Sequence, residues 1–245
     1  MNNPLEGEIQ IWVIDLDSLL NDLPRLKSIL SVDEMTRSAR YRYLPVCQHF
    51  ILARGALRMI CSQYLDSDPR DVVFGYGEHG KPFISQPNTA IQFNLTHSDG
   101  LALAAFTNNI EIGIDIETIR PIAEMEIMVA DHFSPLERAQ FEQLPEYLKP
   151  VNFFNSWTRK EAYVKGRGRG FSLPFNQFSI GMLPGHPVQL LQDGLDESRV
   201  DVWQLMDLVL SDHEEYKAAL AYRSPENCRL TYHVFYPSDI QLGRN

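Results

Sequence analysis

The chain has 245 residues, enough for one large domain or two small ones, and its hydrophobic and charged fractions, 44% and 22%, are those of a globular protein. A formal net charge of −10 argues against a generic nucleic-acid binder, which would be basic. The apolar runs are too short to span a bilayer, so we expect no membrane partner.

The N-terminus and the cysteines predict a cytoplasmic protein. The first eight residues, M-N-N-P-L-E-G-E, contain neither the basic nor the apolar segment of a signal peptide. Cys47, Cys61 and Cys228 form no C-x-x-C motif, so we expect reduced thiols. The histidines show no zinc spacing, which argues against a zinc site.

The early part of the chain predicts two helices. Ser31 and Glu34 form a capping box, which starts a helix that runs to about Tyr43. Pro45 suits the first turn of a second helix, over residues 46–65.

The second of these helices carries one apolar stripe that faces the core. The stripe consists of Phe50, Leu57, Ile60, Cys61 and Tyr64. Arg54 and Arg58 lie one turn apart, and we interpret them as part of a solvated face.

Short β-branched and aromatic runs predict the strands of the first half. We expect strands at residues 11–16, 72–75, 91–95, 101–106 and 110–117. Asn108 and Asn109 supply a turn between the last two of them. Two successive hairpins over residues 91–117 therefore predict an antiparallel sheet.

The second half repeats the order of helices followed by strands. Residues 121–132 are expected to be helical, and a capping box of Ser134 and Glu137 starts a helix to about Leu144. A third, amphipathic helix lies within residues 150–170. We expect strands at residues 178–180, 188–190, 202–205, 216–222 and 230–235. Two similar α+β halves that meet near residue 110 explain this order.

The strand I-G-I-D-I-E places two carboxylates on one face. Asp115 and Glu117 alternate with Ile114 and Ile116, so the acids share one side of the strand. Carboxylates this close repel each other unless a cation lies between them, and oxygen ligands suit Mg²⁺. The alternative is an ordinary half-exposed edge strand.

Glu161 and Lys165 lie one turn apart on the third helix, ahead of the loop G-R-G-R-G. A carboxylate and an ammonium beside a basic loop suit a metal and a polyphosphate; the alternative is a surface ion pair before a glycine C-cap. Lys81 lies on the tight loop G-E-H-G-K-P, where it is either exposed and idle or able to reach a phosphate.

Four motifs in fixed order resemble the Sfp-type 4′-phosphopantetheinyl transferases. They are G-K-P at 80–82, F-N-L-T-H-S at 93–98, G-I-D-I-E at 113–117 and W-T-R-K-E-A-Y-V-K-G-R-G-R-G at 157–170. The resemblance implies an α+β, pseudo-twofold fold of two subdomains, each with helices packed on an antiparallel sheet. We expect an N-terminal half over residues 1–110 and a C-terminal half over residues 111–245, with the active site in the cleft between them.

The resemblance implies the reaction of a holo-[acyl-carrier-protein] synthase. Such an enzyme transfers 4′-phosphopantetheine from coenzyme A to a serine of an acyl or peptidyl carrier protein and releases 3′,5′-ADP. The carriers serve fatty-acid, polyketide or non-ribosomal peptide synthesis. We expect a cytoplasmic monomer that uses Mg²⁺.

The resemblance also assigns roles to single residues. The magnesium ligands are Asp115, Glu117 and Glu161. From the chemistry of such a transfer, which needs a base for the serine and a cation for the leaving phosphate, the candidate catalytic residues are Glu161, as the base or through a metal-bound water that it orients, and Lys165. The residues that bind coenzyme A are Lys81, Pro82, Thr96, His97, Asp115, Lys160 and Lys165.

The basic loop at the end of the third helix is the candidate contact for the carrier. Arg167 and Arg169 offer positive charge to an acidic carrier helix, and Phe171 and Leu173 offer an apolar anchor. The alternative is a loop that only holds phosphate or is mobile.

Two other functions compete with the transferase. One is a different Mg²⁺-dependent enzyme acting on a nucleotide or phosphoester, although the glycines of residues 166–170 lack the lysine and hydroxyl of a P-loop. The other is a non-catalytic carrier-binding protein, against which the three intact carboxylates argue.

Overall fold

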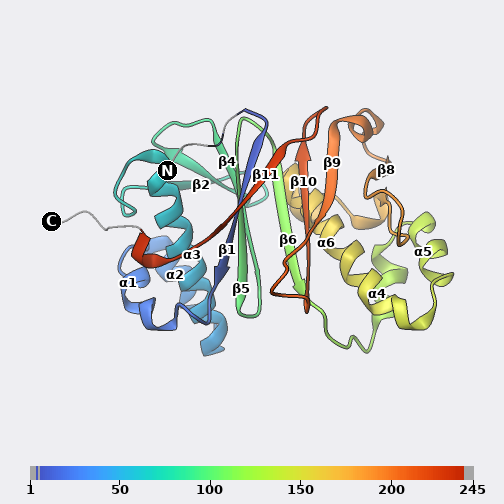
Figure 1. Ribbon diagram of the computed structural model, residues 1–245, viewed down its shortest axis with the longest axis horizontal. Helices are drawn as coiled ribbons and strands as arrows, with labels where there is room; N and C mark the ends of the chain where they lie inside the picture. The colour runs from blue at the N-terminus through green and yellow to red at the C-terminus, as the bar shows by residue number, and fades with distance from the viewer. Residues whose placement is uncertain (1–3, 5, 240–245) are drawn as a thin grey trace. The chain divides into compact units, whose positions relative to one another are not determined.

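Figure 1 shows a computed structural model of the chain, which describes residues 4 and 6–239. The chain divides into two compact units. Of the described residues, those up to Tyr76, residues 82–109 and those from Arg229 onward form unit 1, and residues 77–81 and 110–228 form unit 2. Each unit combines helices with antiparallel strand pairs, which confirms the α+β class.

The main sheet of unit 1 has four strands in the order β11-β1-β5-β4. The strands are β1 (Glu8–Asp15), β4 (Ile91–Ser98), β5 (Leu101–Asn108) and β11 (Arg229–Val234), and β2 (Val73–Tyr76) pairs separately with β3 (Pro82–Gln86). β11 runs parallel to β1, whereas the other pairs are antiparallel. The last strand of the chain therefore belongs to unit 1, although the sequence placed it in the second half. Because β1 and β11 are so far apart in the sequence, no local sequence pattern indicates that they pair.

The expected pair of successive hairpins is only half right. β4 and β5 form the first hairpin, with Phe93 opposite Phe106. β5 has β1 on its other side, so neither edge of β5 is open to β6 (Ile112–Thr118). β6 instead pairs with β10 (Tyr216–Arg223), about a hundred residues later in the sequence.

Three helices build the rest of unit 1: α1 (Leu23–Lys27), α2 (Val32–Ser38) and α3 (Leu44–Leu65). The predicted capping box of Ser31 and Glu34 and the position of Pro45 in the first turn of α3 are confirmed. Every residue from Phe50 to Ser62 is buried, so this part of α3 is enclosed on all sides rather than along one stripe. Its side chains pack in the core with residues of β1, β4 and β5.

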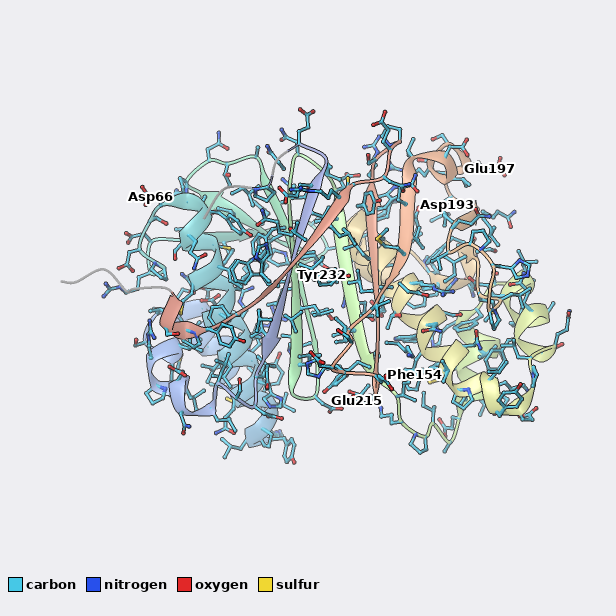
Figure 2. The ribbon with its side chains drawn as sticks, viewed as in Figure 1. Asp66, Phe154, Asp193, Glu197, Glu215 and Tyr232 are labelled. Atoms are coloured by element: carbon cyan, nitrogen blue, oxygen red, sulfur yellow. The ribbon has the colours of Figure 1, made fainter. Side chains whose placement is uncertain are left out.

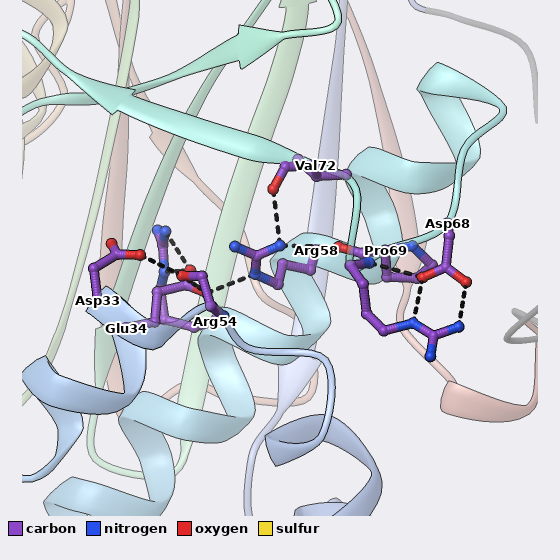
Figure 3. A network of polar contacts seen from close by, with 9 residues as sticks. Asp33, Glu34, Arg54, Arg58, Asp68, Pro69 and Val72 are labelled. Atoms are coloured by element: carbon purple, nitrogen blue, oxygen red, sulfur yellow. Dashed lines mark hydrogen bonds and ion pairs between the residues drawn. The ribbon is translucent and has the colours of Figure 1, made fainter.

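The prediction of a solvated face at Arg54 and Arg58 is wrong. Both are buried and lie against Glu34 of α2 (Figure 3). Arg54 Nε donates to Glu34 Oε1 at 2.8 Å and Arg58 Nε to Oε2 at 2.6 Å, while Arg58 Nη1 donates to the carbonyls of Pro69 and Val72. The counter-charge comes from a neighbouring helix, which the periodicity of α3 alone could not reveal.

The main sheet of unit 2 has three strands in the order β6-β10-β9, with β9 at Trp203–Leu208. β7 (Phe178–Ile180) and β8 (Leu190–Asp193) form a second, small sheet. The helices are α4 (Met125–His132), α5 (Pro135–Glu142) and α6 (Lys149–Arg167). The capping box at the start of α5 is confirmed, and Gly168, with φ of +63°, ends α6 in the left-handed conformation.

Six short 3₁₀ helices complete the secondary structure of the described residues. They are Leu20–Asp22, Glu146–Leu148, Gly170–Ser172, Phe175–Gln177, Glu197–Val202 and Pro237–Asp239. None of the helices described is both long and apolar enough to cross a membrane.

The buried cluster of Glu34, Arg54 and Arg58 predicts a large effect of one isosteric substitution. Glu34→Gln removes the counter-charge of two buried guanidinium groups, and we expect a loss of about 3–5 kcal/mol in the free energy of unfolding. Urea denaturation measures this loss.

Asp68→Asn is the matched control. The ion pair of Asp68 with Arg70 in Figure 3 has the same chemistry at 2.8 Å, but 45% of the arginine side chain is exposed. Solvent screening makes such a pair weak, so we expect a much smaller loss. Similar losses in the two variants would contradict the structural role of Glu34.

Candidate active site

The face of β6 that carries the two acids is pressed against helix α6. Gly113, Asp115 and Glu117 share this face by alternation. A Cβ atom on Gly113 would overlap the carbonyl oxygen of Ala162 and the amide nitrogen of Gly166. Only a hydrogen atom fits at Gly113, and the backbone of the helix therefore lies directly on the strand.

The residues of the neighbouring strand β10 that lie under α6 are also small. On β10, Ala219 lies opposite Asp115 and Ala221 opposite Gly113, and both alanines are fully buried. On the helix itself, a Cβ atom on Gly166 would lie 2.6 Å from the ring of Trp203. Small residues on both elements thus set a short distance between α6 and the sheet.

Asp115 of β6 meets Lys165 of α6 as a result of this packing. Lys165 Nζ donates to Asp115 Oδ1 at 2.5 Å, and the side chains are 30% and 4% exposed, respectively. Burial alone would lower the pKa of Lys165, but the surrounding carboxylates, Asp115 and Glu161 first, raise it above its ordinary value. Lys165 is therefore a stable ammonium at neutral pH.

Glu161 shares this electrostatic environment. Burial raises the pKa of Glu161, and Asp115 and Glu117 add to the shift while Lys165 opposes it. Glu117 also forms an ion pair with Arg120 at 3.5 Å. The structure thus brings the three predicted acids and Lys165 into one group of interacting charges. Within residues 4 and 6–239, however, no set of three His, Cys, Asp or Glu side chains is arranged to hold a metal ion.

Lys160, the neighbour of Glu161, points into the core instead. Its ammonium is fully buried and donates to both carboxylate oxygens of Glu137, at 2.8 and 2.7 Å, and to the carbonyl of Phe178. Burial lowers the pKa of Lys160 to about 8, against the opposing effect of Glu137. Lys160 therefore ties α6 to α5 and β7, and its nitrogen is closed to an external phosphate in this structure.

Lys81 is likewise engaged within unit 2. Its Nζ donates to the carbonyl of Ile112 at 2.8 Å and to that of Gly166 at 2.9 Å. The ammonium thus bonds to the strand of Asp115 and to the helix of Lys165. The idle, exposed alternative for Lys81 does not hold.

The other predicted coenzyme A residues belong to unit 1. Thr96 and His97 are neighbours on β4, so their side chains point to opposite faces of the strand. Thr96 is buried and His97 is exposed. Pro82 is the first residue of β3, opposite Tyr76.

The expected carrier-binding loop is largely part of the core. Arg167 is only 4% exposed and forms an ion pair with the buried Asp193 at 2.7 Å, while Tyr163 Oη donates to the same carboxylate. Asp193, labelled in Figure 2, is the last residue of β8. Leu173 is also buried. Arg169 is exposed, whereas the side chain of Phe171 lies outside the described part of the chain. The prediction that Arg167 and Leu173 present a docking surface is therefore wrong.

Two cations beside the acids were not predicted from the sequence. Lys217 lies directly opposite Glu117 on β10, so the two side chains share one face of the sheet. Arg120 contacts Glu117 from the loop that follows β6. The strand at residues 216–222 was predicted, but its register against β6 could not be read from its pattern.

Comparisons with known proteins identify the family of the chain. The family model of the 4′-phosphopantetheinyl transferase superfamily matches residues 111–221, which include the strand and the helix of the acids. The 4′-phosphopantetheinyl transferase HetI of Nostoc is 34% identical over 85% of this chain and 86% of its own length. Sfp of Bacillus subtilis is 31% identical over 70% and 76%. A holo-ACP-synthase structure from Plasmodium yoelii matches 46% of this chain and 92% of that chain, with 20% identity and a TM-score of 0.35.

The chain belongs to the 4′-phosphopantetheinyl transferase superfamily. The family and the enzyme class that the four motifs predicted are confirmed.

The contact between β6 and α6 predicts that Gly113 cannot be replaced. Gly113→Ala forces the strand and the helix apart, and we expect a loss of about 3 kcal/mol or more in the free energy of unfolding. Chemical denaturation measures the loss, and Gly77→Ala is the control because its nearest heavy atom would lie 3.7 Å from the new Cβ. Wild-type stability of Gly113→Ala would show that the two backbones do not touch.

Proposed function

We propose that the group of charges at the β6–α6 contact carries out the transfer of 4′-phosphopantetheine from coenzyme A to a carrier serine. The observation that carries the proposal is the convergence of Asp115, Glu161 and Lys165 from two elements far apart in sequence. Superfamily membership supports the same reaction. The serine oxygen attacks the phosphorus that bears the pantetheine, the phosphoanhydride bond breaks, and 3′,5′-ADP leaves with the electron pair.

Asp115, Glu117 and Glu161 have the chemistry that a magnesium ion requires. All three are oxygen donors, and their mutual repulsion contributes to the raised pKa of Glu161. The Lys165 ammonium on Asp115 shows that positive charge is stabilised at this point. When bound, Mg²⁺ would neutralise charge on the pyrophosphate and act as a Lewis acid.

Glu161 is the candidate base for the carrier serine. A carboxylate with a raised pKa holds a proton more tightly than an ordinary glutamate and is therefore a better base near neutral pH. The same shift means that the basic form is lost as the pH falls through the raised pKa. In the metal-free protein, Glu161 should therefore become protonated at a higher pH than an ordinary glutamate.

Lys165 is the candidate cation for the leaving group. Its pKa is raised, so it remains charged throughout the neutral range. A fixed ammonium beside the departing phosphate stabilises the negative charge that develops on it.

The remaining contacts to coenzyme A follow from the resemblance. Of the two neighbours on β4, His97 is the exposed one, and we assign the contact with the 3′-phosphate region to it. Thr96 and Pro82 stay predictions, as does the location of the active site in a cleft between two halves. Lys160 is left out of this set because its ammonium bonds to Glu137 inside the core.

The carrier and the state of the enzyme are also part of the proposal. Arg169 is exposed beside the buried Arg167, and it is the residue of this loop that we assign to an acidic carrier helix. We further propose that the protein acts as a monomer in the cytoplasm, where its three free cysteines stay reduced.

The direct test is one incubation of an apo carrier protein with coenzyme A and Mg²⁺, read by mass spectrometry. The wild type should add one phosphopantetheine, and chelation of the metal should stop the addition. Glu161→Gln should lower the rate by at least about 10²-fold, since it removes the base and a metal ligand.

The control for this test is Glu197→Gln, the same substitution at an exposed position of unit 2. Both variants should melt near the wild-type temperature. Wild-type labelling by Glu161→Gln would contradict the role of Glu161. Carrier binding without any gain of mass by the wild type would favour a non-catalytic binding protein.

A further inference from the structure

The ammonium of Lys81 is hydrogen-bonded inside the protein, an arrangement that binding a ligand does not require. Its ammonium is held between two backbone carbonyls of unit 2, those of Ile112 and Gly166. Among the described residues, no carboxylate forms an ion pair with it. Burial lowers the pKa of Lys81 to about 8, and Glu111 opposes the shift only in part.

The two carbonyls belong to the ends of the elements that carry the acids. Ile112 is the first residue of β6, and Gly166 lies in the last turn of α6. The last four carbonyls of a helix have no partner within the helix and carry its partial negative charge, so a cation is favoured there. Lys81 therefore joins the start of the strand to the end of the helix.

The loop presents the lysine in a fixed conformation. The amide of Gly77 donates to the carbonyl of Lys81 at 2.9 Å, and the amide of Gly80 donates to the carbonyl of Gly77 at 2.9 Å. The alkyl stem lies against the helix cap, because a Cβ atom on Gly168 would be 3.3 Å from Lys81 Cδ. These hydrogen bonds and contacts leave the ammonium of Lys81 little freedom to point elsewhere.

We infer that Lys81 is a positioning residue, whose bridge between Ile112 and Gly166 sets how closely the strand of Asp115 approaches the helix of Glu161 and Lys165. This inference rests on the proposed function and assigns a structural task within that site to the lysine of the G-K-P motif. Asp115 follows Ile112 by three residues, and Lys165 directly precedes Gly166. A shift at the bridge is therefore passed to the acids through very short stretches of backbone.

A lysine that bridges two carbonyls and a lysine that binds phosphate differ in which of their N–H donors are available. An ammonium that binds phosphate from solution must keep its donors available, whereas two donors of Lys81 are already used inside the protein. Loss of the bridge should impair the placement of the acids, hence metal affinity and turnover, rather than the affinity for coenzyme A.

The test compares Lys81→Met, which removes the ammonium and keeps the stem, with Lys81→Arg, which keeps charge and two donors. Steady-state transfer gives kcat and the KM for coenzyme A, and water-proton relaxation gives the affinity for Mn²⁺ without coenzyme A. For Lys81→Met we expect kcat and Mn²⁺ affinity to fall about tenfold or more, with the KM for coenzyme A within about twofold of the wild type. Lys81→Arg should recover most of both losses.

Lys27→Met is the control, since Lys27 is exposed on α1. A raised KM for coenzyme A with unchanged Mn²⁺ affinity would overturn the inference in favour of a ligand contact. Unchanged kcat and Mn²⁺ affinity would overturn it as well. An inactive wild type would contradict the proposed function, whereas the Mn²⁺ measurement would still decide the role of Lys81.

A second measurement covers the case in which Lys81→Met does not fold. In wild-type protein labelled with ¹³Cε-lysine, the signal of Lys81, assigned through Lys81→Arg, is followed as coenzyme A is added. A bridge that stays in place leaves the chemical shift and the pKa of Lys81 unchanged. A rise of about one pKa unit or more would show that the ammonium has moved to a phosphate, and would overturn the inference.

Discussion

The direct contact between the backbones of β6 and α6 determines the geometry of the charged site. Gly113 on the strand and Gly166 on the helix leave no room for side chains, and the alanines of β10 continue this flat surface. Among the described residues, no layer of large apolar side chains separates β6 from α6 at this point. Carboxylates on the one and charged groups on the other therefore meet at hydrogen-bonding distance in partly buried surroundings, where their interactions are strong.

Several basic residues that the sequence analysis assigned to coenzyme A, to the carrier or to the solvent serve the fold instead. Lys160 is paired with Glu137, Arg167 with Asp193, and Arg58 with Glu34, all in buried positions. Each pair connects two or more elements, and each buried charge has its partner and further hydrogen bonds, as burial requires. Only a small set of the described cations lies near the acids and is available to bind a phosphate, and Lys165 is the best defined of them.

The sequence predicts local structure well and long-range contacts poorly in this chain. The capping boxes at Ser31 and Ser134 and the glycine after α6 depend on neighbouring residues, and all three are confirmed. The pairing of β6 with β10 and of β11 with β1 joins segments far apart in the sequence, and no local pattern records it. The acids of the site were found because strand alternation and helix spacing place them, whereas the burial of Lys160 and Arg167 depends on partners from other elements.

The pKa of Glu161 tests most directly whether strand and helix share one electrostatic environment. Carboxylate ¹³C NMR titration of the metal-free protein measures it in the wild type, in Asp115→Asn and in Lys165→Met. In the wild type we expect the pKa of Glu161 to lie above that of an ordinary glutamate, with a lower value in Asp115→Asn and a higher one in Lys165→Met. An ordinary pKa that neither substitution moves would show that β6 does not bring its acids to α6, and would contradict the account.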